Sequence, residues 1–207
     1  MKTHTKETQS TMTPERALEF LKDGNQRFQN NMKGNRNLLQ QVNETRNGQF
    51  PFAVILSCID SRVPTEMVFD QGLGDIFSIR IAGNFINEDI LGSMEFACKV
   101  AGSKLIVVMG HSACGAVKGA CDLIELGNLT GLLSKIYPAV EAVEETGDRT
   151  SANKEFVQKV ANKNVEIAML QLKAKSPVLN EMLENVEIGL VGGMYSVETG
   201  KVEFNNL

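Results

Sequence analysis

The sequence predicts one α/β domain: a mostly parallel central sheet of about four strands, a short antiparallel edge strand, and flanking helices. Two short apolar runs, at 52–57 and 104–109, have the length and continuity of buried parallel strands. A helical apolar pattern lies between such runs, as in a βαβ unit. The 207 residues show no internal repeat, low-complexity tract or linker, which also favours a single domain.

The amino-terminal part is predicted to be an arm followed by helices. Residues 1–12 are polar and predict a flexible arm in front of a domain that spans 13–207. Two helices open this domain within 13–47. Thr13 is a suitable N-cap for the first helix, and Pro14 suits its first helical position.

The rest of the chain alternates strands with helices. In chain order we expect a strand at 52–57, a short helix at 64–69, a strand at 75–81, a helix at 88–101, a strand at 104–109, helices at 115–126, 132–143 and 155–175, a short helix from 177, and a strand at 186–197. Thr199-Gly200 is a hairpin signal, so 201–204 is predicted to be the antiparallel edge strand.

Composition excludes several classes of protein. The hydrophobic content of 43% and charged content of 22% are ordinary for a soluble globular chain. A net charge of −4 argues against nucleic acid as a partner. No window approaches 18 uninterrupted apolar residues, so we expect no membrane span. The polar amino terminus lacks a secretory pattern, so we expect a cytoplasmic protein.

Four cysteines in such a chain favour metal or catalytic use over disulfides. Cys98 and Cys121 lie in amphipathic helical patterns and are expected to be inert buried thiols. Cys58 and Cys114 instead lie in polar motifs. The motif C-I-D-S-R at 58–62 follows the first apolar strand, and H-S-A-C-G at 111–115 follows the third.

The carboxyl ends of parallel strands are where ligands bind in such sheets. The simplest geometry therefore brings Cys58, His111 and Cys114 together at one edge of the sheet. Two thiolates and one imidazole favour zinc, and three protein ligands leave the fourth position open, as in a catalytic site. The alternative is that both cysteines are buried and that His111 is a satisfied turn histidine.

Asp60 and Arg62 flank this candidate zinc site. At alternating positions past a strand, their side chains can point to the same side and form a bidentate pair. The pair can be a structural ion pair. Beside an open metal position, an Asp60 kept ionised by Arg62 can instead orient the group bound there. Because two thiolates neutralise the zinc charge, such a site needs a helper of this kind.

Taken together, C-x-D-x-R and the H-x-x-C inside G-H-S-A-C-G resemble the β-class carbonic anhydrases of bacterial type. The resemblance covers residues 14–125 well and the last strand more loosely. Further matches in family order are Gln49-Phe50-Pro51, Gly72 to Gly74, Arg80 followed by Ala82-Gly83-Asn84, and Glu95-Phe96-Ala97.

The resemblance implies a zinc lyase, a carbonate dehydratase, that reversibly hydrates carbon dioxide to bicarbonate and a proton. It implies one zinc per chain on Cys58, His111 and Cys114, with Asp60 and Arg62 as the catalytic pair. Residues implied to bind substrate are Gln49, as a hydrogen-bond donor, and Phe77, Ala82 and Phe96, as an apolar carbon dioxide pocket. The residues alone favour plain core packing for those last three.

The resemblance also implies a homodimer or homotetramer, because the site lies at a subunit interface. Family members regulated by bicarbonate have Trp three residues before the first Cys and Gly directly before it. Here those positions are Ile55 and Ser57, although Tyr195 resembles the third residue of that pocket. We therefore expect an open site with Asp60 off the zinc. His4 is the one histidine besides His111, so we also expect buffer-dependent proton release.

Three alternatives stay open at this point. The same zinc centre can hydrolyse carbon disulfide or carbonyl sulfide. The chain can be an inactive, zinc-stabilised structural protein, although the intact Asp60–Arg62 pair argues against this. A thiol redox protein is disfavoured because there is no C-x-x-C motif.

Overall fold

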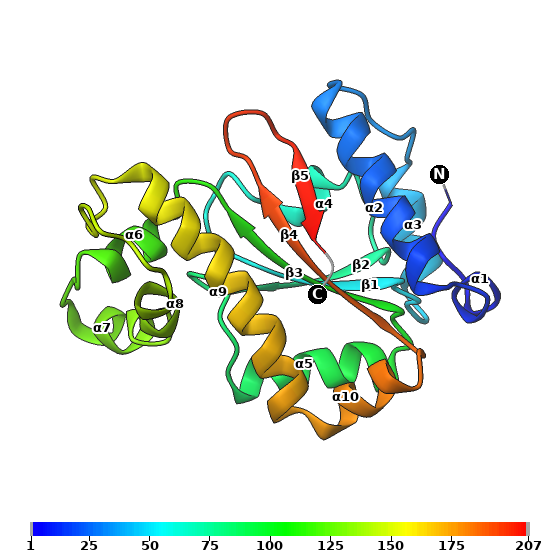
Figure 1. The fold of residues 1–207 in the computed structure, drawn as a ribbon. Helices are drawn as coiled ribbons and strands as arrows, with labels where there is room; N and C mark the ends of the chain where they lie inside the picture. The colour runs from blue at the N-terminus through cyan, green and yellow to red at the C-terminus, as the bar shows by residue number, and fades with distance from the viewer. Residues whose placement is uncertain (1, 206–207) are drawn as a thin grey trace.

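The central feature of the computed structural model, which describes residues 2–205, is a five-stranded sheet in the order β2-β1-β3-β4-β5 (Figure 1). The strands are β1 (Ala53–Ser57), β2 (Ile76–Arg80), β3 (Leu105–His111), β4 (Gly189–Tyr195) and β5 (Val202–Asn205). Neighbours from β2 to β4 pair in parallel, and β5 pairs antiparallel to β4. The predicted fold class is confirmed. Met1 of the predicted arm and residues 206–207 of the predicted domain lie outside the described residues.

Helices cover both faces of this sheet and its carboxyl end. They are α1 (Lys6–Ser10), α2 (Pro14–Gln29), α3 (Leu38–Thr45), α4 (Thr65–Val68), α5 (Glu88–Glu95), α6 (Gly115–Cys121), α7 (Gly127–Leu133), α8 (Tyr137–Ala142), α9 (Lys154–Lys175) and α10 (Pro177–Glu184). The start of α2 follows the predicted chemistry. The Thr13 side chain accepts a hydrogen bond from the Arg16 N–H at 3.2 Å, and Pro14 is the first helical residue.

Two predicted helices were wrong in extent. The helix expected at 115–126 ends at Cys121, because Leu123 adopts φ +53° and turns the chain without a glycine to mark the site. The helix expected at 132–143 is two helices, α7 and α8. Pro138 has no N–H to continue a helix from the preceding turn, and it lies instead in the first turn of α8.

The helix expected at 88–101 changes type partway along. Its second half, η1 (Phe96–Val100), is a π-helix, and the Ala101 N–H bonds to the Phe96 carbonyl, five residues earlier, at 2.9 Å. The apolar pattern alone does not distinguish these two helical forms, and single-turn π segments are frequent near functional sites.

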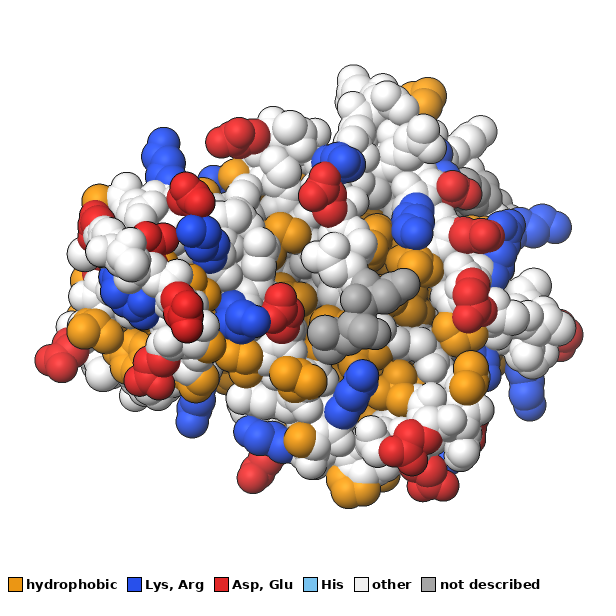
Figure 2. Space-filling model, viewed as in Figure 1, with side chains coloured by type: hydrophobic (Ala, Val, Ile, Leu, Met, Phe, Trp, Pro, Cys, Tyr) orange, Lys and Arg blue, Asp and Glu red, His pale blue; other side chains and the backbone are white. Residues whose placement is uncertain are grey.

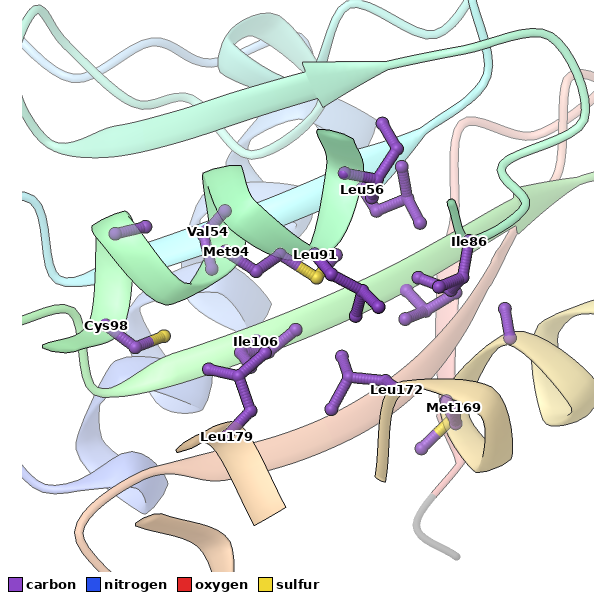
Figure 3. Close-up of a cluster of buried hydrophobic side chains, with 14 of the residues drawn as sticks. Val54, Leu56, Ile86, Leu91, Met94, Cys98, Ile106, Met169, Leu172 and Leu179 are labelled. Atoms are coloured by element: carbon purple, nitrogen blue, oxygen red, sulfur yellow. The ribbon is translucent and has the colours of Figure 1, made fainter. Parts of the chain in front are cut away.

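Alternating residues of the strands supply two apolar layers. On one face, Val54, Leu56 and Ile106 pack under α5, α9 and α10 (Figure 3). On the other face, Ile55, Val107 and their neighbours pack against α2 and α4. Because β1 and β3 are buried on both faces, the sequence shows them as continuous apolar runs rather than as an alternation.

The amino-terminal arm lies against the domain through specific contacts. The buried Gln9 side chain donates to the carbonyls of Pro51 and Ala101, each at 2.8 Å. The His4 ring packs edge-on against Phe52, with centroids 5.2 Å apart. Flexibility of the arm stays a prediction, and these contacts show where it docks.

The surface carries mixed charge. Figure 2 shows positive and negative side chains interspersed over one face, without a large field of one sign. Within residues 2–205, no helix combines the length and apolar character needed to cross a membrane.

Candidate metal centre

Three elements bring the predicted metal ligands to the carboxyl end of the sheet. Cys58 directly follows β1, and His111 is the last residue of β3, the strand beside it. Ala113 adopts φ +55°, which turns the chain tightly so that Cys114 forms the N-cap of α6. Parallel pairing of β1 and β3 therefore places two motifs that are distant in sequence at one point.

The ligand atoms of Cys58, His111 and Cys114 all lie within 4.8 Å of one another. The two Sγ atoms are 3.9 Å apart. All three residues are buried, with exposed fractions of 4%, 0% and 1%. Such a set of donor atoms, converging from two loops, has the spacing needed to share one ion.

His111 supplies the test of whether the site fits a metal. Its Nδ1 lies 3.0 Å from the Ser112 carbonyl oxygen, so Nδ1–H is the donor and Nε2 carries the lone pair. Nε2 is fully buried and has no hydrogen-bond partner among residues 2–205. A buried, unpaired acceptor costs free energy unless something binds it. Together with two sulfurs, this nitrogen fits zinc.

The electrostatics favour a thiolate at Cys58. The Cys114 thiol donates a hydrogen bond to the Cys58 sulfur. This bond is the largest of several contacts, which include the Gly83 N–H at 3.4 Å, that outweigh burial and lower the pKa of Cys58 to about 4. The same contact and burial raise the pKa of Cys114. Of the two sulfurs, Cys58 is therefore the one that ionises more readily.

Asp60 and Arg62 form the predicted bidentate pair beside this cluster. Arg62 Nε donates to Asp60 Oδ1 at 2.9 Å and Nη2 donates to Oδ2 at 2.7 Å. The Arg62 backbone N–H adds a third bond to Oδ1 at 3.0 Å. The guanidinium hydrogen bonds hold the pKa of Asp60 well below its usual range. Asp60 Oδ2 also lies 3.9 Å from His111 Nε2, so the carboxylate borders the cluster.

Sequence reasoning missed the backbone supports of this site. Arg80, at the end of β2, donates from Nε to the Cys58 carbonyl at 3.0 Å and from Nη2 to the Asp60 carbonyl at 2.7 Å. Gly83, with φ +79°, directs its N–H at the Cys58 sulfur. A cation near the end of a predicted strand and a glycine just past that strand were the available signal, but only the fold shows which motif these two residues reach.

The predicted substrate residues lie mostly elsewhere. Gln49 precedes the amino end of β1 and is exposed, and the strand, about 16 Å long at 3.3 Å per residue, separates it from Cys58. Phe77 is near the amino end of β2, where it pairs with Val54 in the register. Ala82 alone is near the cluster, in the loop that carries Gly83.

Phe77 and Phe96 lie together on the outer side of the sheet. Their rings meet edge to face, with centroids 6.2 Å apart. They line an open hollow of about 660 Å³ between the edge strand β2 and α5. Phe96 is 51% exposed, which is unusual for a side chain that only packs a core.

A buried Cys-His-Cys cluster, which supplies three ligands at the carboxyl ends of parallel strands, is typical of a zinc enzyme. Residues 53–202 match the family described as carbonic anhydrase. Carbonic anhydrase 2 of Mycobacterium tuberculosis is 37% identical over 197 residues, covering 91% of each chain. A carbonic anhydrase of Mycolicibacterium smegmatis is 34% identical over 196 residues, covering 93% of this chain and 94% of that one.

Solved structures show the same fold. The β-carbonic anhydrase CafA of Aspergillus fumigatus superposes with a TM-score of 0.70 at 24% identity, covering 81% of both chains. Two tetrameric β-carbonic anhydrases are described from Sordaria macrospora, and the structure compared has a TM-score of 0.67 at 22% identity, covering 81% of this chain and 90% of that one. The chain belongs to the carbonic anhydrase family, and within it to the β class, whose members are enzymes.

Proposed function

We propose that this chain reversibly hydrates carbon dioxide to bicarbonate at one zinc ion held by Cys58, His111 and Cys114. The observation that carries the proposal is the buried convergence of these three ligands beside a carboxylate already bound by arginine. When bound, zinc supplies the Lewis acidity that makes water a nucleophile at neutral pH.

Asp60 and Arg62 have the role of orienting the reacting group. Arg62 uses two guanidinium hydrogen bonds to fix the Asp60 carboxylate, so both oxygens keep one orientation. The low pKa of Asp60 keeps it an acceptor throughout the neutral range. Because Asp60 is bonded to Arg62, a zinc ion held by Cys58, His111 and Cys114 would keep a position for water or substrate.

Carbon dioxide is apolar, and its binding residues are proposed to be Ala82 from the loop at the cluster, Phe77 from β2, and Phe96 from η1, which contacts Phe77. Gln49 would donate a hydrogen bond to the substrate. Because a strand length separates Gln49, Phe77 and Phe96 from Cys58 within one chain, these three would serve the site of a second copy.

We propose a homodimer or a homotetramer for this reason. The edge strand β2 leaves one side of its backbone without a neighbouring strand among residues 2–205. Apolar side chains are exposed near it, including Phe96 at 51% and Val100 at 72%. A second copy that covers this edge would bury both features. Light scattering of the purified protein would give the mass.

Proton release would depend on buffer. His4, the one histidine besides His111, lies in the amino-terminal arm and packs against the rings of Phe20 and Phe52, which also contact each other. It is thus held in an aromatic cluster and is not placed to carry protons from the metal centre. Turnover that rises with buffer concentration is the expected result, and a rate independent of buffer would contradict this part of the proposal.

The test is carbon dioxide hydration by stopped flow, with zinc measured on the same sample. We expect about one zinc per chain, and Asp60→Asn should keep the zinc while lowering turnover about 100-fold or more. Asp23→Asn, on the exposed face of α2, is the matched control and should behave as wild type. Hydrolysis of carbon disulfide or carbonyl sulfide without carbon dioxide hydration, or zinc without either activity, would overturn the proposal.

A further inference from the structure

One polar side chain lies on the buried face of the longest helix. Within α9 (Lys154–Lys175), every buried side chain except Asn164 is apolar. Asn164 is 3% exposed and stands between Ala161 and Val165 on this face. Burying an amide costs free energy unless it is hydrogen-bonded, so apolar packing alone does not account for an asparagine here.

The partner of this amide is the backbone of the loop that covers Cys58. Asn164 Nδ2 donates to the Gly83 carbonyl at 2.7 Å in a buried hydrogen bond. The N–H of the same glycine points to Cys58 Sγ at 3.4 Å. A continuous chain of hydrogen bonds therefore runs from α9 through one residue to a metal ligand.

Gly83 needs such an anchor because of its own conformation. Its φ of +79° lies in the left-handed region, which glycine enters freely and leaves as freely. The direction of its N–H is thus not fixed by local backbone preference. A rigid helix residue that binds the carbonyl side of Gly83 limits that rotation and keeps the N–H on the sulfur.

We propose that Asn164 is a positioning residue for the metal centre: its side-chain amide fixes Gly83 so that the Gly83 N–H stays on the Cys58 sulfur. The inference rests on the proposed zinc site. Hydrogen bonds to a ligand from outside the coordination sphere orient that ligand and tune how strongly it donates to the metal, and losing one commonly weakens metal binding about 10- to 100-fold.

The variant that isolates this role is Asn164→Leu. Leucine has the same branched shape and suits an apolar helix face, but it has no donor for the Gly83 carbonyl. Asn162→Leu is the matched control, because Asn162 lies on the same helix but is exposed and pairs with Gln158.

Two measurements read the metal site without using turnover. The first is zinc affinity by competition with a chelator, where we expect Asn164→Leu to bind about 10-fold more weakly or worse and Asn162→Leu to match wild type. The second is the thiolate-to-metal absorption band of the cobalt-substituted protein. This band should move to longer wavelength in Asn164→Leu, because a sulfur that loses a hydrogen bond gives up its electrons more readily.

Thermal unfolding of the metal-free proteins separates positioning from stability. A lower melting temperature with wild-type zinc affinity and an unshifted cobalt band would assign Asn164 a purely structural role and overturn the inference. If Asn164→Leu does not fold, Asn164→Ser gives the same readouts, since the serine hydroxyl is too short to reach Gly83. If Asn164→Ser had the zinc affinity and the cobalt absorption band of wild type, that result would also overturn the inference. A wild-type protein that binds no zinc would instead overturn the proposed function itself.

Discussion

The carboxyl end of the sheet and the outer edge of β2 differ in how much of a site one chain supplies. At the carboxyl end, three ligand atoms lie within 4.8 Å of one another, and the adjoining Asp60 is fixed by Arg62. At the outer edge, Phe96 is half exposed beside an open hollow. One chain thus brings together all three predicted metal ligands, whereas the proposed substrate half lies at an exposed edge that we propose a second copy covers.

The largest expected effect is at the metal half. Cys58→Ala should remove the metal and reduce carbon dioxide hydration to background, because two donors no longer hold zinc tightly. Cys98→Ala is the matched control, since Cys98 is a buried thiol whose pKa is raised to about 12 by burial and which packs in the apolar layer under α5. Metal analysis and stopped flow on both variants make the measurement. Full zinc content in Cys58→Ala would show that Cys58 is not needed to hold the metal.

Arg62→Leu should give the next largest effect. Without the guanidinium, Asp60 loses its two side-chain bonds and its fixed orientation. We expect turnover about 100-fold lower with zinc retained, comparable to removal of one preorganised group in an active site. Turnover within twofold of wild type would show that the pair is an ordinary ion pair.

At the substrate half, Gln49→Ala should have a moderate effect. Loss of one neutral hydrogen bond to substrate corresponds to about 3- to 10-fold in kcat/KM. Zinc content should not change, because Gln49 is a strand length from the ligands. Gln26→Ala, an exposed glutamine of α2, serves as the control. An equal loss in both variants would remove the proposed role of Gln49.

The smallest expected effect is on how the free energy of unfolding depends on pH through Asp60. The Arg62 hydrogen bonds lower the folded-state pKa of Asp60, so their contribution to the free energy of unfolding is fully present above the unfolded pKa of about 4. It is lost as pH falls through the lower folded pKa. Urea unfolding of wild type and Asp60→Asn should therefore differ by a constant amount from pH 5 to 8 and converge in stronger acid. A difference that grew as pH fell would contradict this assignment.

Sequence reasoning was sufficient where local pattern and topology coincide. Continuous apolar runs identified β1 and β3, and their parallel pairing brought Cys58 beside His111 as predicted. Sequence reasoning was insufficient where the deciding contact joins residues far apart in the sequence or where no residue type marks a turn. The bond from Asn164 to Gly83 joins residues 81 positions apart, and Leu123 turns the chain at positive φ without a glycine. Neither feature leaves a periodic or compositional signal.

The direct test of the central claim, that a second copy supplies the substrate-binding residues for each metal centre, is complementation between two variants. Gln49→Ala and Asp60→Asn chains carrying different tags are co-expressed, and the mixed dimers are purified through both tags. One site of each mixed dimer would then combine an intact Asp60 with Gln49 of the partner subunit. The account predicts about half of wild-type turnover per dimer. Turnover equal to the mean of the two separate variants would contradict it.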